Sequence, residues 1–224
     1  MKSILEIDSV TKSFGDNKII TDVYLRCESN DIIGILGKNG SGKSTLFKIL
    51  FGTLSADNKF IKIDGKIYDQ PYKSKNILTY LPQKTFLPSH LRLNSLIELC
   101  FGKYAVDVFL NDDVLYKLKQ SKVYNLSGGE LRYLEVKIVL FIKSKFAILD
   151  EPFSNMSPIL IDELKKIIIE KSKIKGIILA DHDYENVFSV ANKYYFMSNG
   201  SVELIKDKFD FVNKGYISHS KFIL

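Results

Sequence analysis

The residues with the clearest chemical potential form a glycine-rich segment, which reads Gly37-Lys38-Asn39-Gly40-Ser41-Gly42-Lys43-Ser44 and satisfies GxxxxGK[ST]. It follows an apolar run directly and leads through Thr45 into residues that favour a helix. Glycines let backbone N–H groups curl around phosphate oxygens, and a helix N-terminus adds partial positive charge. We expect Lys43 to reach the β- and γ-phosphates of a nucleotide and the Ser44 hydroxyl to ligate Mg²⁺. The segment therefore predicts a nucleoside triphosphate site.

Two adjacent carboxylates end a second apolar run, 146–149. Phosphoryl transfer needs support for a metal ion and a group that orients the attacking water, and carboxylates at a strand end supply both. We expect Asp150 to hold Mg²⁺, directly or through water, and Glu151 to polarise the nucleophilic water. The structural alternative is that both residues merely end a buried strand before Pro152.

A third segment, Leu126-Ser127-Gly128-Gly129-Glu130, precedes an amphipathic stretch. Ser127 and Glu130 have the spacing of a capping box, which would start a helix. Capping does not require two successive glycines, whereas close approach of backbone amides to a phosphate does. Both interpretations are compatible, so the segment predicts a helix N-terminus that also binds an anion.

The elements that must position these groups alternate between strands and helices, which predicts an α/β sheet. Helical periodicity is present in 131–141 and 160–168, and Asp64-Gly65 predicts an antiparallel hairpin in a strand-rich N-terminal third. Residues 84–125 contain no convincing strand and predict a small helical insert within one domain, 1–224. Short apolar runs typical of strands occur at 4–10, 19–27, 32–36, 60–63, 77–81, 146–149, 177–180 and 194–197.

Composition excludes several other classes of protein. The chain has 224 residues and a net charge of +6, but all except three of its 32 basic residues are lysines. Arginine dominates base reading, so sequence-specific nucleic-acid binding is not expected. Cys27 and Cys100 lack zinc or disulfide spacing, and no run reaches the ~20 apolar residues that span a bilayer. We expect a folded protein of the reducing cytosol that meets membranes only through a partner.

Taken together and in this order, the motifs resemble the nucleotide-binding subunit of the ATP-binding cassette (ABC) family over nearly the whole chain. The resemblance implies an ABC-type P-loop fold with a mixed central sheet, an N-terminal antiparallel part and an inserted helical subdomain. It implies ATP and Mg²⁺ as ligands. It also implies a head-to-tail dimer with a second copy or a related subunit, in which Leu126 to Glu130 bind the ATP held by the other copy's phosphate loop.

The resemblance assigns three further residues. Gln83 matches the family's glutamine loop, which touches Mg²⁺ or water and moves with the partner protein. His182 matches the switch histidine near the γ-phosphate, and Phe14 matches the aromatic residue that stacks on adenine. Taken singly, each has a more ordinary interpretation, as a loop residue, a structural histidine or a core phenylalanine. Their joint order with the three stronger motifs favours the functional one.

One position departs from the family pattern. The loop after Glu151 usually ends in Asp, and this chain has Ser157 there, followed by Pro158. Serine before proline is a good helix N-cap, so the local fold should persist. Because the family assigns communication between its two ATP sites partly to this loop, we expect slow or weakly cooperative hydrolysis.

The leading functional hypothesis is an energy-coupling ATPase at the cytoplasmic face of the cell membrane, joined to separate transmembrane permease subunits. Phe86, Leu87 and Leu91 are candidate docking residues, with the core of the helical insert as the alternative. A soluble ABC ATPase acting on ribosomes or nucleic acid remains the second hypothesis, and a small-molecule kinase the third. Five lysines are expected to form a solvated helix face, with acidic lipid or RNA as the alternative partner; they are Lys165, Lys166, Lys171, Lys173 and Lys175.

Overall fold

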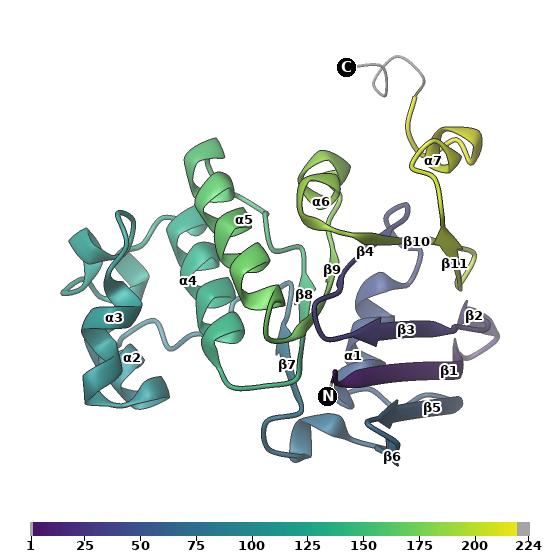
Figure 1. Ribbon diagram of the computed structural model, residues 1–224, viewed down its shortest axis with the longest axis horizontal. Coiled ribbons are helices and arrows are strands. Elements are labelled where there is room, and N and C mark those ends of the chain that lie inside the picture. The colour runs from purple at the N-terminus through teal and green to yellow at the C-terminus, as the bar shows by residue number, and fades with distance from the viewer. Residues whose placement is uncertain (1, 219–224) are drawn as a thin grey trace.

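A computed structural model describes residues 2–218 and shows an α/β protein with two sheets (Figure 1). The fold class expected from the sequence is confirmed. The larger, mixed sheet has six strands, and all neighbouring pairs are parallel except β10 with β11. Their order across the sheet is β11 (Ser201–Ile205), β10 (Lys193–Ser198), β4 (Ile32–Leu36), β9 (Gly176–Ala180), β8 (Phe146–Asp150) and β7 (Leu78–Leu81).

Parallel pairing explains why distant motifs meet. The strands β4, β7, β8 and β9 run in the same direction, so their carboxyl ends lie at one edge of the sheet. The phosphate loop follows β4, and Glu151 follows β8. Gln83 and His182 come shortly after β7 and β9. Such an edge is the usual ligand-binding position of an open α/β sheet.

The second sheet is antiparallel and N-terminal. Its central strand β1 pairs with β2, β3 and β5, and the predicted Asp64-Gly65 hairpin joins β5 to β6. The bounds are β1 (Ile4–Phe14), β2 (Asn17–Ile20), β3 (Leu25–Glu28), β5 (Asn58–Ile63) and β6 (Lys66–Ile67). The single strand expected at 19–27 is wrong. Strand β2 stops pairing with β1 after Ile20. From there the chain pairs with the segment at the start of β11 instead, because Thr21 N–H donates to Gly200 O at 2.9 Å and Asp22 forms a bridge with Ser201.

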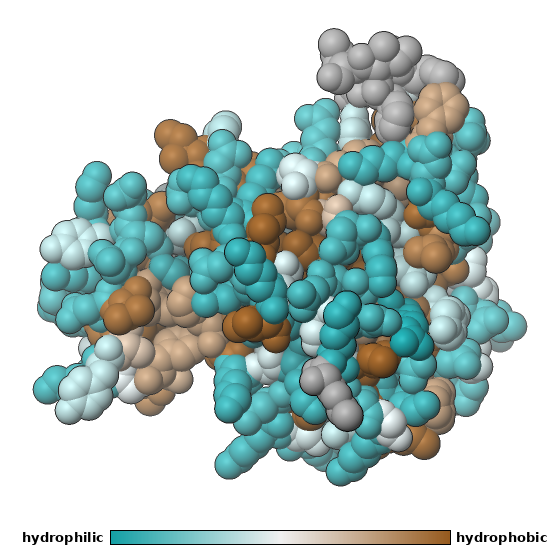
Figure 2. Space-filling model, in the orientation of Figure 1, coloured by the Kyte–Doolittle hydropathy of each residue, from teal (hydrophilic) through white to brown (hydrophobic). Residues whose placement is uncertain are grey.

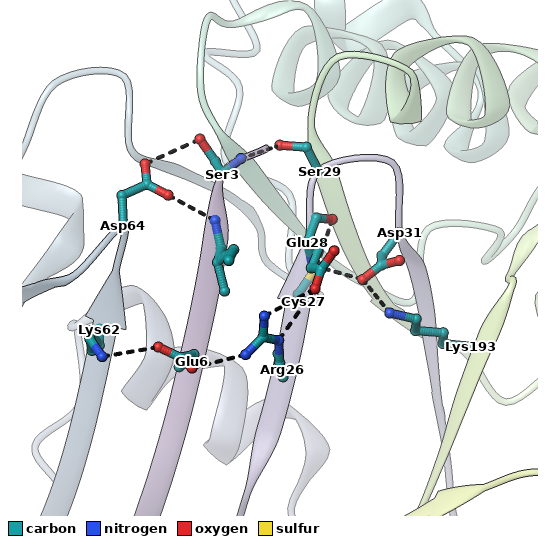
Figure 3. Close-up of polar contacts among 11 residues, drawn as sticks. Ser3, Glu6, Arg26, Cys27, Glu28, Ser29, Asp31, Lys62, Asp64 and Lys193 are labelled. Atoms are coloured by element: carbon teal, nitrogen blue, oxygen red, sulfur yellow. Dashed lines mark hydrogen bonds and ion pairs between the residues drawn. The ribbon is translucent and has the colours of Figure 1, made fainter. Parts of the chain in front are cut away.

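Two carboxylates fasten neighbouring turns: Asp64 lies in the β5–β6 hairpin, and Asp31 lies in the turn that joins the two sheets (Figure 3). Asp64 accepts hydrogen bonds from the Ile4 N–H at 2.8 Å and the Ser3 hydroxyl at 3.1 Å, which fixes the start of β1. Asp31, between β3 and β4, accepts from the Glu28 N–H at 2.7 Å and pairs with Lys193 at 2.8 Å. These contacts align the first strand of each sheet with its neighbours.

The helices cover both faces of the mixed sheet and form an insert at one end of the molecule (Figure 1). Buried residues of β4 alternate between two clusters: Ile32 and Leu36 belong to one, and Ile33 and Ile35 to the other. The first cluster holds α4, α5, α6 and the insert, whereas the second holds α1 and the antiparallel sheet. The helices are α1 (Lys43–Phe51), α2 (Leu93–Phe101), α3 (Val106–Leu110), α4 (Gly128–Phe141), α5 (Pro158–Ser172), α6 (Tyr184–Val190) and α7 (Asp210–Asn213). Within residues 2–218 no helix is both long and apolar enough to cross a bilayer.

A polar hub attaches the insert to α4. Asp112 accepts hydrogen bonds from the N–H groups of Val114 and Leu115 at 3.0 and 2.6 Å. The same carboxylate accepts from the Tyr133 hydroxyl at 3.2 Å and pairs with Lys137 Nζ at 2.5 Å. Because Tyr133 and Lys137 lie on one face of α4, a turn apart, the hub ties the irregular end of the insert to a regular helix.

Lys175 contradicts the expectation of a fully solvated lysine face. Its side chain is only 2% exposed, and its Nζ donates to Leu140 O and Ile142 O at 2.8 Å and to Ser144 Oγ at 3.0 Å. Helix ends leave backbone carbonyls without intrahelical donors, and a cation complements the partial negative charge there. Lys175 thus completes the C-terminal end of α4 from a distant segment of the chain.

This burial predicts a pH-dependent stability. Burial lowers the pKa of Lys175 to about 8, with the charge of Lys171 as a smaller cause. Between this value and the ordinary pKa of about 10.4 the unfolded chain binds a proton that the folded chain does not, so stability rises with pH. We expect the free energy of unfolding of the wild type, relative to Lys175→Met, to increase by about 2 kcal/mol from pH 7.5 to 9.5.

Urea denaturation of both proteins at the two pH values measures this difference. Lys173→Met is the matched control because Lys173 is exposed two residues away, and it should show no pH-dependent difference from the wild type. If the free energies of unfolding of the wild type and of Lys175→Met differ by the same amount at pH 7.5 and pH 9.5, the pKa of Lys175 is not shifted in the folded protein.

Candidate ATP site

The phosphate loop joins β4 to α1 and owes its shape to glycine. Gly42, the residue before α1, has φ 107°, and Gly40 has φ 79°, both in the region that other residues rarely adopt. A Cβ on Gly37 would collide with the backbone carbonyl of Met197 on β10. The loop is therefore packed against the neighbouring strand, with its backbone curled as the sequence predicts.

Lys43 lies at the first position of α1 and folds back over the loop. Its Nζ donates to Gly37 O at 2.7 Å and to Lys38 O at 3.1 Å. Burial lowers the pKa of Lys43, although the carboxylates of Asp150, Glu151 and Asp181 oppose that shift. Burial of an ammonium costs free energy that hydrogen bonds to neutral carbonyl oxygens offset only in part. A bound anion would offset more of that cost.

Asp150 meets the phosphate loop from β8. Its Oδ1 accepts from the Ser44 hydroxyl at 3.1 Å, and its Oδ2 accepts from the Tyr80 hydroxyl on β7 at 3.2 Å. Burial raises the pKa of Asp150, and the two hydrogen bonds partly oppose this. The hydroxyl of Ser44 and the carboxylate of Asp150 are hard oxygen donors that converge in one place, which fits the ligand preference of Mg²⁺.

A cavity of about 420 Å³ brings most of the sequence-predicted ATP residues together. Gln83, Asp150 and Glu151 line one part of it. Phe14 lines it too and is half exposed, with Lys12 Nζ 5.1 Å from its ring centroid. The phosphate-loop residues that line the cavity are Asn39, Gly40, Ser41, Gly42, Lys43, Ser44 and Thr45. The size and lining suit a nucleotide whose ring would meet an aromatic face and whose phosphates would meet the loop.

His182 is not among the residues that line this cavity, and its side chain is 62% exposed. Its Nδ1 lies 3.3 Å from Oδ1 of the buried Asp181. Asp181 in turn accepts from the N–H groups of Phe153 at 3.0 Å and Asp183 at 3.1 Å, and burial raises the pKa of Asp181. The carboxylate therefore joins the end of β9 to the segment that follows Glu151, with the imidazole at the surface.

The segment Leu126 to Glu130 lies apart from that cavity. Its capping box is formed: the Ser127 hydroxyl accepts from the Glu130 N–H at 3.3 Å, and Glu130 Oε2 accepts from the Ser127 N–H at 2.8 Å. A Cβ on Gly129 would lie 2.7 Å from Asn155 O, which explains the second glycine by close backbone packing. A separate open cavity of about 750 Å³ is lined by Ser127 to Glu130 together with Lys117 and Ser157.

Ser157 caps α5 as expected. Its hydroxyl accepts from the Leu160 N–H at 3.4 Å, and Pro158 occupies the first helical position. The loop after Glu151 thus keeps its helix cap without the family's usual carboxylate. Ser157 lines the same open cavity as Ser127 to Glu130 of the segment Leu126 to Glu130, which we call the signature segment.

Three polar residues of the site escaped the sequence analysis: Tyr80, Arg132 and Asp181. Asp181 follows a predicted strand directly, which is a weak signal by itself. Arg132 stands out in the sequence as one of three arginines in a lysine-rich chain. Nothing in the sequence distinguishes Tyr80 from a strand residue that packs in the core.

Comparison with known protein families and with individual proteins finds ATP-binding proteins of ABC transporters. The family described as ABC transporter matches residues 20–154. The lipopolysaccharide export system ATP-binding protein LptB of Haemophilus influenzae is 29% identical, covering 89% of each chain. LptB of Escherichia coli K12 is 27% identical, covering 88% of this chain and 87% of that protein.

Solved structures agree at the level of the fold. The ADP conformation of MJ1267, an ATP-binding cassette of an ABC transporter, superposes with a TM-score of 0.76 at 25% identity, covering 99% of this chain and 98% of that one. An ATP-binding subunit of an ABC transporter gives 0.81 at 22% identity, covering 96% and 95%. With the family match over more than half of the chain, these findings show that the protein belongs to the ATP-binding subunits of ABC transporters and is an ATPase that powers transport.

Proposed function

We propose that this chain hydrolyses Mg²⁺-bound ATP within a head-to-tail dimer and drives separate transmembrane subunits at the cytoplasmic face of a membrane. The observation that carries the proposal is the convergence of Lys43, Ser44, Asp150 and Glu151 on one cavity at the carboxyl edge of the mixed sheet. These four groups come from two segments more than 100 residues apart, and each has the chemistry that a phosphoanhydride requires.

Each residue has a defined task in this proposal. Lys43 leaves its carbonyl partners to pair with the β- and γ-phosphates, while Phe14 stacks on the base. Glu151 accepts the proton of a water that attacks the γ-phosphorus as the bond to the β-phosphate oxygen of ADP breaks, which yields ADP and phosphate. Gln83 and His182 orient the water and the γ-phosphate. Ser44, Gln83 and Asp150 would hold Mg²⁺, which when bound offsets phosphate charge.

The position of the signature segment supports a dimer. Ser127, Gly128 and Gly129 line a cavity that shares no residue with the ATP cavity of the same chain. Their helix N-terminus nevertheless has the form of an anion site, with open space beside it. A second copy, placed head to tail, would bring its ATP to this segment and use both surfaces. A related ABC subunit would fit the same arrangement.

Exposed apolar side chains on the helical insert support a membrane partner. Leu99, Tyr104 and Val108 are each at least three-quarters exposed, and Phe86 is about half exposed beside the Gln83 segment. Figure 2 shows apolar groups interrupting the polar surface at the end of the molecule that carries α2 and α3. Leu87 and Leu91 instead pack against the core of the insert, so Phe86 is the better docking candidate of the three named from the sequence.

The test is to capture the closed assembly. Glu151→Gln, purified from native membranes in mild detergent with ATP, should retain its dimer and its membrane subunits, which mass spectrometry identifies. A second preparation, Glu151→Gln combined with Lys43→Met, controls for contacts that do not depend on ATP. Enrichment of a polytopic membrane protein in the first preparation is the expected result, and that protein would also indicate the cargo. Enrichment of ribosomal or nucleic-acid proteins without a membrane subunit would contradict the proposal.

A further inference from the structure

Arg132 is a buried cation on α4, the helix that begins at Gly128, and it contacts the backbone next to Gln83 and at Asp150 and Glu151. It lies on the second turn of α4, and its side chain is 5% exposed. Its Nη1 donates to Pro82 O at 2.8 Å, next to Gln83, and its Nη2 donates to the backbone carbonyls of Asp150 and Glu151. One guanidinium thus contacts two separate backbone segments, the one before Gln83 and the one that carries Asp150 and Glu151.

The contact with Glu151 has a conformational role. Glu151 has φ 54°, a left-handed conformation that non-glycine residues adopt only when their surroundings impose it. Its carbonyl accepts from Arg132 Nε at 3.2 Å, from Arg132 Nη2 at 3.1 Å and from the Ser154 hydroxyl at 3.0 Å, while its N–H donates to Ala180 O at 2.7 Å. Arg132 therefore supplies two of the hydrogen bonds that hold the backbone of the proposed catalytic carboxylate.

Glu135 extends the network to the other side of Gln83. This residue, one turn along α4, is 1% exposed and pairs with Arg132 Nη1 at 3.2 Å. Its second carboxylate oxygen accepts from the Thr85 hydroxyl at 2.5 Å and from the Phe86 N–H at 3.0 Å. The Gln83 segment is thus held by Arg132 just before the glutamine and by Glu135 just after it.

Because α4 is a continuous helix that begins at the signature glycines, a movement of its N-terminus also moves Arg132. We propose that Arg132 is a positioning residue that couples the signature end of α4 to Glu151 and the Gln83 segment of the same chain. The inference rests on the proposed dimer, in which that end of α4 meets the ATP of the other copy. Arg132 then links the two ATP sites through backbone carbonyls, in a protein whose loop residue Ser157 lacks the usual carboxylate.

A purely structural ion pair is the competing explanation, and Lys137 offers the matched comparison. Lys137 is equally buried on the same helix, pairs with Asp112 and contacts Phe109 O, but has no contact with the strand ends. If burial of a charge on α4 were all that mattered, Arg132 and Lys137 variants would behave alike.

The experiment compares Arg132→Lys, Glu135→Gln and Lys137→Met with the wild type, each as the full chain with its co-purified membrane subunits. Lysine keeps the charge of Arg132 but loses the planar fork that reaches several carbonyls at once. We expect Arg132→Lys to lower kcat by about 10- to 100-fold, with the KM and Kd for ATP within about threefold, because misplacement of a reacting group affects chemistry more than binding. Its Hill coefficient for ATP should fall to 1.

Lys137→Met should lower the melting temperature and leave kcat within twofold of the wild type. Glu135→Gln, which keeps the shape of the side chain, should lower kcat in the same direction as Arg132→Lys and serves as the second variant if the latter folds poorly. A kcat within twofold of the wild type for both network variants would overturn the coupling role. An inactive wild type would instead contradict the proposed function, so the two failures are distinct.

Discussion

Replacing Glu151 with glutamine is expected to lower kcat for ATP hydrolysis by at least about 100-fold, because glutamine cannot accept the proton of the attacking water. The two side chains have almost the same shape, and the left-handed backbone of Glu151 is held by its carbonyl and N–H rather than by its carboxylate. The Kd for ATP should therefore stay within about threefold. Phosphate release and equilibrium binding of ATP, measured on the same preparation, separate the two effects.

Glu185→Gln is the control for this substitution. Glu185 is an exposed carboxylate in the first turn of α6, at the same carboxyl edge of the sheet, and does not line the ATP cavity. It should leave kcat within twofold. A Glu151→Gln protein that hydrolyses ATP within tenfold of the wild type would exclude Glu151 as the proton acceptor.

Lys43→Met is expected to raise the Kd for ATP by about 30- to 150-fold, since a hydrogen-bonded charge pair contributes about 2 to 3 kcal/mol. The nucleotide-free protein should be no less stable than the wild type, because the substitution removes a buried ammonium whose hydrogen bonds reach only the carbonyls of Gly37 and Lys38. The rise in melting temperature that saturating ATP gives the wild type should be much smaller for this variant at the same ATP concentration.

Lys48→Met provides the matched variant. Lys48 is exposed on the same helix, one turn further along, and its side chain does not line the ATP cavity. Its Kd for ATP should match that of the wild type within twofold. A large loss of stability in nucleotide-free Lys43→Met would indicate that the ammonium holds the loop together rather than awaiting a phosphate.

Local sequence patterns predicted those elements that depend on neighbouring residues alone, such as a buried strand or a tight turn. The run 32–36 is β4 to the residue, and Asp64-Gly65 forms the expected hairpin. The strand expected at 19–27 failed because its interruption depends on Gly200 and Ser201, almost 180 residues away. The prediction for Lys175 failed for the same reason. Its carbonyl partners lie at the end of α4, and the spacing of the lysines in 165–175 does not indicate them.

For the candidate site too, the sequence predicted the contiguous motifs and missed the residues that contact distant segments. The phosphate loop and the capping box are contiguous, so their residue types and spacing carry the geometry, as Gly42 and Glu130 show. Arg132 contacts backbone carbonyls and Asp181 contacts backbone N–H groups of other segments, and because every residue type supplies such groups, the sequence does not indicate them. His182 remains a prediction, because its imidazole lies outside the cavity lining in this conformation.

The two hydrophobic clusters on opposite sides of the mixed sheet have a consequence for hydrogen exchange. Every residue of β4 and β9 is buried, and both strands are paired on each side, so their amides should exchange only when the whole sheet opens. The phosphate loop is anchored to β4 at the carboxyl end of these strands. Bound ATP should therefore slow exchange in β4 and β9 by the factor by which it lowers the equilibrium population of the unfolded state, while exchange of the amides of α2 and α3 is independent of that factor.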